Sequence, residues 1–200
     1  METANFEVIK LPPHSTGGLP FFDVISKRST NRNFKSDKYM SLQQVSDCLW
    51  CAYGENRPIT GHGHKTVASA CNICPFTVYV FLKDGIFIYD SLKNELQPFK
   101  KGDFREKSGG NDFCKFCNMN IVFMQKKNAE CPYKGVTLDE NTRNRYADLD
   151  GGHCTQMVYL YAATQGLCCC ERAWADEKVL KEVLNLGDDY RFTISISIGY

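Results

Sequence analysis

The chain has 200 residues, of which 43% are hydrophobic and 24% are charged. These proportions are typical of a folded globular protein and exclude a disordered chain. The chain has 24 Lys and Arg residues and 23 Asp and Glu residues, so its net charge is +1. This near-neutral charge argues against nucleic acid or an anionic membrane as a partner. No apolar run approaches the roughly 18 residues of a membrane span. We therefore expect one domain over residues 1–200.

The start of the chain lacks the basic and apolar regions of a secretory signal, which favours a cytoplasmic location. The composition is unusual in its 11 cysteines. An odd number leaves at least one thiol unpaired within the chain, and in a reducing compartment we expect most of them to be free.

The first part of the sequence predicts two helices. Residues 19–28 are typical of a short helix, with Pro20 at its first position and basic residues in its last turn. Ser41 and Gln44 have the spacing of a capping box, in which each side chain bonds the other residue's backbone. The helix that they open should end at Gly54.

A β-hairpin should follow. Residues 75–82 are β-branched and aromatic, Asp84 and Gly85 supply the turn, and residues 86–89 run back. Residues 120–124 predict a further buried strand, with polar loops at 100–111 and 126–139.

The last part predicts two helices and a strand. Residues 154–167 are apolar on nearly every side and should form a central buried helix, with Gly151 and Gly152 at its entry. Asp176 can cap a second helix. Residues 192–198 alternate apolar with small polar side chains, which predicts a strand with one buried face. The expected fold class is therefore α+β.

One basic cluster has the chemistry of an anion site. Arg28 and Arg32 flank Ser29 and Thr30 directly after the first predicted helix. Guanidinium groups bind phosphate oxygens bidentately, and hydroxyl groups add neutral donors. A solvated surface is the other interpretation of such a short basic cluster.

Asn72 precedes the first hairpin strand. An Asn side chain presents a donor and an acceptor to a planar heterocycle, although a turn Asn can equally bond its own backbone.

In order and spacing these clusters resemble the flavin-dependent nitroreductase family, and in particular its small branch related to the SagB-type flavin dehydrogenases. The motifs that carry the resemblance are Arg28-Ser29-Thr30-Asn31-Arg32, Leu49 to Pro58, Ser69-Ala70-Cys71-Asn72 and Tyr159-Leu160-Tyr161-Ala162. The chain departs from the family pattern at Cys74, where many relatives have Gln, and at Ala173, where Gly is common.

The resemblance implies an FMN-binding α+β fold, with a mainly antiparallel sheet flanked by helices. It also implies a homodimer with a flavin at each of two interfaces. By position, the residues that would bind FMN are Arg28, Ser29, Thr30 and Arg32 at the phosphate and ribityl chain, Asn72 at the isoalloxazine edge, and the backbone of Glu171, Arg172 and Ala173 along the ring.

The implied activity is hydride transfer from NAD(P)H through FMN to small planar acceptors such as nitroaromatics and quinones. We assign no catalytic side chain. The alternative within the resemblance is a SagB-like dehydrogenase that oxidises peptide azolines. Such an enzyme needs a base, and neither Lys134 nor Tyr146 is convincingly placed as one.

A different class is suggested by three CxxC pairs, Cys48/Cys51, Cys71/Cys74 and Cys114/Cys117. The first two pairs are separated by 19 residues, which fits a four-cysteine zinc site and a zinc-binding module without catalysis. The other interpretation is that these cysteines are free thiols packed as small apolar groups.

Overall fold

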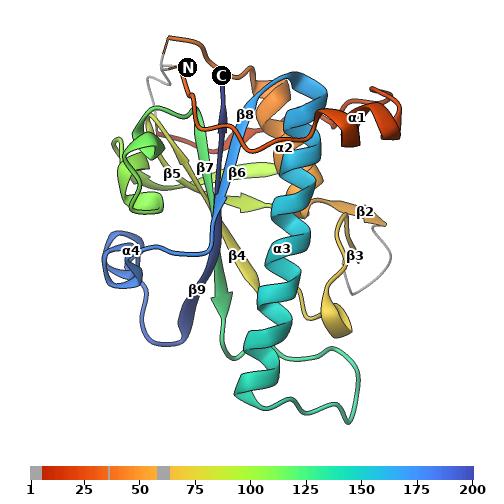
Figure 1. Cartoon of the computed structure of the whole chain (residues 1–200). Coiled ribbons are helices and arrows are strands. Elements are labelled where there is room, and N and C mark those ends of the chain that lie inside the picture. The colour runs from red at the N-terminus through yellow and green to blue at the C-terminus, as the bar shows by residue number, and fades with distance from the viewer. Residues whose placement is uncertain (1–5, 36, 58–63) are drawn as a thin grey trace.

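A seven-stranded sheet lies at the centre of the structure, and helices cover both of its faces (Figure 1). The computed structural model describes residues 6–35, 37–57 and 64–200. The spatial order of the strands is β1-β6-β5-β4-β7-β9-β8, and all neighbouring pairs are antiparallel. The strands are β1 (Ile9–Lys10), β4 (Phe76–Leu82), β5 (Gly85–Asp90), β6 (Glu95–Lys101), β7 (Met119–Lys126), β8 (Cys168–Arg172) and β9 (Tyr190–Gly199). The predicted α+β class is confirmed.

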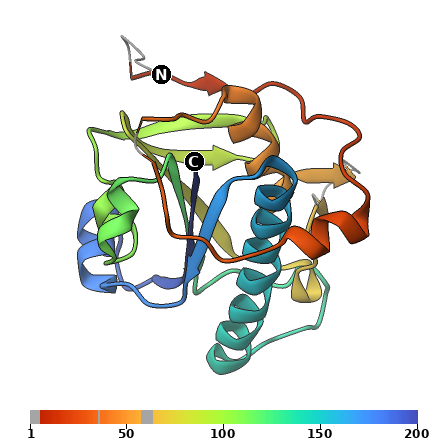
Figure 2. The same ribbon diagram turned by 45° about the horizontal axis from the view of Figure 1, so that its top comes forward.

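Among the described residues, four α-helices and three short 3-10 turns complete the fold. The helices are α1 (Phe21–Lys27), α2 (Leu42–Tyr53), α3 (Glu140–Gln165) and α4 (Glu177–Leu184), and the turns are η1 (Ala70–Asn72), η2 (Arg105–Ser108) and η3 (Asp112–Lys115). Helices α2 and α3 cover one face of the sheet, whereas α4 lies with η2 on the other (Figures 1 and 2). A small ladder of β2 (Glu55–Arg57) and β3 (His64–Lys65) stands apart. No helix among the described residues has the length and apolar character to cross a membrane.

The local signals for the ends of α2 and for the start of α4 were correct. The Gln44 N–H donates to Ser41 Oγ at 3.1 Å and the Ser41 N–H donates to Gln44 Oε1 at 2.9 Å, so the capping box is present. Helix α2 ends before Gly54, and Asp176 caps α4 as predicted. Pro20 precedes α1 rather than occupying its first position.

The hairpin and the central strand are also confirmed. Strand β4 pairs with β5 through Tyr79 and Ile88, and with β7 through Val80 and Ile121. The sequence did not predict β6, which carries charged residues and Pro98. Strand β1 pairs only with Glu95 and Leu96 at the start of β6, so Pro98 lies beyond the paired residues. Proline is tolerated where a strand has an open edge.

The predicted start of the central helix was wrong. Helix α3 begins at Glu140, so Gly151 and Gly152 lie in its middle and not at its entry. A Cβ atom at Gly151 would lie 3.0 Å from the side chains of Thr193 and Ile194. The close approach that this glycine permits is therefore to β9, not to a ligand.

The prediction of one buried face for β9 was also wrong, because both faces are covered. Ser195 and Ser197 are fully buried between β7 and β8. Both hydroxyls accept hydrogen bonds from the guanidinium of Arg172, a residue of the neighbouring strand β8. Small polar side chains at alternate positions therefore indicate a buried polar partner here, not solvent.

Candidate active site

The Tyr159 hydroxyl joins three segments that are distant in the sequence. It accepts a hydrogen bond from Thr30 Oγ1 at 3.2 Å and another from the Glu171 N–H at 2.9 Å. The Asn31 N–H also donates to the Cys169 carbonyl at 3.0 Å, so the segment after α1 runs beside the edge strand β8. The structure thus brings the predicted phosphate cluster and the end of β8 together at α3.

Two arginines at this junction are available for an anion. The Arg28 guanidinium lies 5.5 Å from the centre of the Tyr159 ring, a cation–π contact that leaves its donors free. Arg28 is half-buried and Arg32 is exposed. Neither belongs to any ion pair among the described residues. With the exposed Ser29 between them, they have the donor set that a phosphate monoester requires, whereas the Thr30 hydroxyl already donates to Tyr159.

Burial favours the protonated form of the Tyr159 hydroxyl. It raises the pKa of this side chain, against the opposing effect of the hydrogen bonds from Thr30 and Glu171. The neutral hydroxyl is therefore the form that holds the junction at physiological pH.

The residues at the end of β8 have different roles. Glu171 and Ala173 are exposed, whereas Arg172 is buried. The Arg172 side chain lies against η3, with its guanidinium carbon 5.4 Å from the centre of the Phe113 ring. Only the backbone of Arg172 is left for a ligand on the α3 side, which is the role that the resemblance implies.

Asn72 lies apart from this junction. The turn that carries it is bonded to α3 through Asp150, which accepts from Ser69 Oγ at 2.6 Å and from the Ala70 N–H at 3.1 Å. Asp150 and Tyr159 are about 13 Å apart along the helix axis, at a rise of about 1.5 Å per residue. Within one chain, the structure does not bring Asn72 to the arginine cluster.

Asn72 instead lines a polar cavity of about 390 Å³. Lys65 and Glu55 also line it, as an ion pair of 2.9 Å whose side chains are 10% and 12% exposed. The second carboxylate oxygen of Glu55, Oε2, is buried and has no hydrogen-bond partner among the described residues. The sequence did not predict this pair, although Glu55 falls within the 49–58 motif.

A larger cavity of about 630 Å³ lies between the N-terminal arm, α1, α2 and α3. Its walls include His14 stacked on Trp50, with ring centres 3.7 Å apart, and the apolar residues Met157 and Leu160 of α3. No site residue predicted from the sequence lines it.

The cysteines do not form a metal centre within residues 6–35, 37–57 and 64–200. The structure shows no group of three or more potential ligands there. Cys48 is fully buried in α2, and this burial raises the pKa of its thiol well above the usual range. Cys169 and Cys170 are likewise buried in β8, as small apolar residues would be. The zinc interpretation therefore has no geometric support in the described residues.

Comparison with known proteins places this arrangement in a family. The sheet, the two covering layers and the arginine cluster beside an edge strand define an α+β domain with two unpaired arginines at one edge of its described residues. The model of the nitroreductase family matches residues 25–200, and the chain belongs to that family.

Solved structures have the same fold. A protein from Ralstonia eutropha JMP134, solved as a candidate nitroreductase, is 28% identical with a TM-score of 0.84, over 96% of this chain and 89% of that one. A nitroreductase family protein from Clostridium difficile 630 is 16% identical with a TM-score of 0.58, over 91% and 84%. A chain of the Escherichia coli microcin synthetase McbBCD complex with truncated pro-MccB17 bound is 17% identical with a TM-score of 0.68, over 96% and 77%. A search of curated proteins gave no match.

The contribution of the Tyr159 hydroxyl to the free energy of unfolding can be measured, with a second tyrosine of α3 as the control. The Tyr161 hydroxyl is buried but has no hydrogen-bond partner among the described residues. Tyr159→Phe leaves the Glu171 N–H without its acceptor, so we expect a loss of about 1–2 kcal/mol in the free energy of unfolding. Tyr161→Phe should cost far less. Urea denaturation of both variants makes the comparison, and equal losses would contradict the assigned role of Tyr159.

Proposed function

We propose that this protein is an FMN-dependent oxidoreductase that transfers hydride from NAD(P)H to small planar acceptors, such as nitroaromatics and quinones. One observation carries the proposal. In a chain of the nitroreductase family, Arg28 and Arg32 stand without ion-pair partners in the described structure, beside the backbone of β8. We also propose that the chain is one FMN-binding domain over residues 1–200. The free cysteines support a cytoplasmic location.

The donor groups at the junction fit a flavin mononucleotide. Arg28 and Arg32 would hold its phosphate and Ser29 would donate to it, while Thr30, whose hydroxyl already donates to Tyr159, would accept from a hydroxyl of the ribityl chain. The backbone from Glu171 to Ala173 would lie along the ring, since no described strand pairs with this edge of β8 and its bridge to Asn31 is at Cys169. When bound, FMN would supply the two-electron hydride chemistry, which no side chain can perform.

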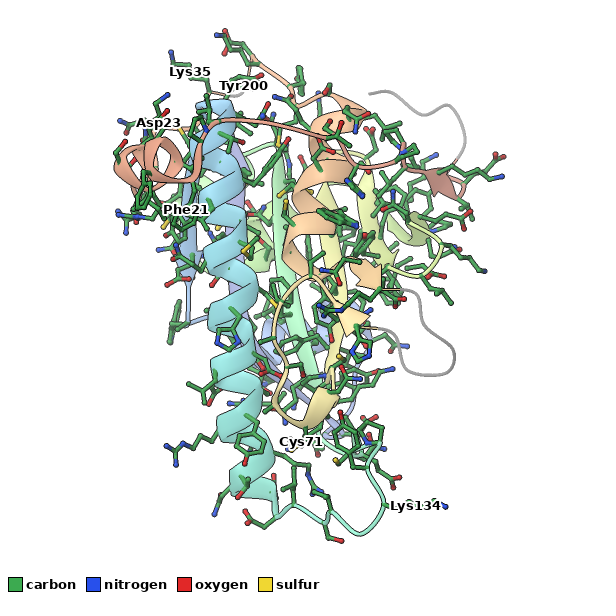
Figure 3. The ribbon with its side chains drawn as sticks, turned by 90° about the vertical axis from the view of Figure 1, so that its right-hand side faces the viewer. Phe21, Asp23, Lys35, Cys71, Lys134 and Tyr200 are labelled. Atoms are coloured by element: carbon green, nitrogen blue, oxygen red, sulfur yellow. The ribbon has the colours of Figure 1, made fainter. Side chains whose placement is uncertain are left out.

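The chain's own residues would position the reactants and limit access of water. The Tyr159 hydroxyl fixes the phosphate loop to β8 through its two accepted hydrogen bonds. Reduction of a small acceptor then needs no dedicated base, because water can deliver the protons. A peptide-azoline dehydrogenase does need one, and Figure 3 shows Lys134 at the outer side of the loop before α3, pointing away from the body of the protein. Small acceptors are the better supported substrates.

We further propose that the protein works as a homodimer. Helix α1 projects from the body and contacts α3 (Figures 2 and 3). Its Phe21 and Phe22 are 64% and 82% exposed, and Leu19 and Ile25 beside them are also exposed. A second copy would cover this apolar face. It would also complete the pocket, since one chain keeps Asn72 and the arginine cluster at different points along α3.

Anaerobic stopped-flow mixing of the FMN-loaded protein with NADH or NADPH tests the activity. We expect bleaching of the flavin absorbance by at least one nicotinamide and its return on mixing with a quinone or nitroaromatic, with ping-pong steady-state kinetics. Failure of both nicotinamides to reduce the flavin would contradict the reductase proposal. Oxidation of a peptide azoline would then favour the dehydrogenase alternative, and a colourless protein with stoichiometric zinc would favour the zinc module.

Sedimentation velocity at micromolar concentration tests the dimer. The wild type should sediment as a dimer, and Phe22→Asp should give monomers, because it places a charge in the proposed apolar interface. Leu92→Asp, at an exposed residue in the turn between β5 and β6, is the matched control and should remain dimeric. A flavin-loaded wild-type monomer would contradict the proposal.

A further inference from the structure

Cys71 and Cys131 lie together although they are 60 residues apart in the sequence. The Cys131 Sγ atom is 3.8 Å from the Cys71 carbonyl oxygen. Burial raises the pKa of the Cys71 thiol, and the neighbouring Cys131 raises it further. Both side chains are half-buried, so small reagents reach them. Figure 3 shows Cys71 on the turn that faces the loop before α3.

The partner of Cys71 is therefore not the one that its CxxC motif suggests. Cys74 is directed elsewhere, with its Sγ atom 3.7 Å from Asn72 Oδ1, and it lines the polar cavity. The structure favours a dithiol formed between the Asn72 turn and the loop of residues 127–139, across two segments and not within one motif.

We propose that Cys71 and Cys131 form a reversible disulfide that ties the loop of residues 127–139 to the Asn72 turn. The oxidant is a low-molecular-weight disulfide of the glutathione class. One cysteine thiolate attacks a sulfur of that disulfide and releases one small thiol, which leaves a mixed disulfide. The second cysteine thiolate then attacks the protein sulfur and releases the second small thiol. The pair has lost two electrons and two protons, and the oxidant has become two thiols.

The bond would act on the polar cavity, because the two tethered segments form part of its walls. Asn72 and Cys74 come from the turn, and Glu130 and Pro132 come from the loop. Cys71 and Asn72 have φ angles of 52° and 51°, a conformation that residues other than glycine rarely adopt. A covalent tether would hold this turn in place. The disulfide itself requires no bound flavin and stands independently of the proposed activity.

The test is thiol mapping of the full-length protein after equilibration with oxidised glutathione. Free thiols are blocked by alkylation, and peptides are mapped without reduction. We expect a linked peptide pair containing Cys71 and Cys131, reversed by dithiothreitol. Cys71→Ser and Cys131→Ser should each leave the remaining cysteine as a stable mixed disulfide. Cys168→Ser removes another half-buried thiol and should retain the link.

Glutathione on both Cys71 and Cys131 without a link, or a link from Cys71 to Cys74, would overturn the proposal. Hydrogen exchange supplies a second measurement. Oxidation should slow amide exchange in residues 70–74 and 127–139 of the wild type and of Cys168→Ser, and leave it unchanged in Cys71→Ser. Unchanged exchange in the linked wild type would refute the tethering of the loop.

Discussion

The proposed site depends on the two hydrogen bonds that the Tyr159 hydroxyl accepts. The backbone at Glu171 and the side chain of Thr30 both donate to it, and the Arg28 guanidinium lies over the same ring. About two turns earlier in the same helix, the absence of a side chain at Gly151 lets α3 pack closely on β9. One buried side chain thus sets the distance between the arginine cluster and the edge of the sheet.

Strand β8, which carries Glu171, is also anchored from the opposite face of the sheet. Arg172 is buried and has no carboxylate partner among the described residues, but its Nε atom donates to Ser195 at 3.2 Å and its guanidinium also bonds Ser197. These bonds offset the cost of removing a charge from water. Gly109 leaves room for the guanidinium, since a Cβ atom there would lie 2.2 Å from Arg172 Nε. The end of β8 is therefore fixed before any ligand binds.

Structural features that depend on a few neighbouring residues could be predicted from the sequence, whereas contacts between distant segments could not. The Ser41 capping box and the β4–β5 hairpin depend on adjacent residues, and both are present. The start of α3 was misplaced because the residues before Gly151 are mostly polar, so they lack the apolar pattern of a buried helix. The Lys65–Glu55 pair and the contact of Cys71 with Cys131 join segments that only the fold brings together.

The binding of FMN and of riboflavin, which lacks the phosphate, tests the central claim most directly. If Arg28 and Arg32 hold the phosphate, the wild type should bind FMN more tightly than riboflavin. The double variant Arg28→Ala/Arg32→Ala should lose about a hundredfold or more in FMN affinity, at about 1.5–3 kcal/mol for each of the two charge-assisted contacts, and bind riboflavin as before. Arg145→Ala, at an exposed arginine of α3, is the control. Equal binding of FMN and riboflavin by the wild type, or unchanged FMN affinity in the double variant, would contradict the account.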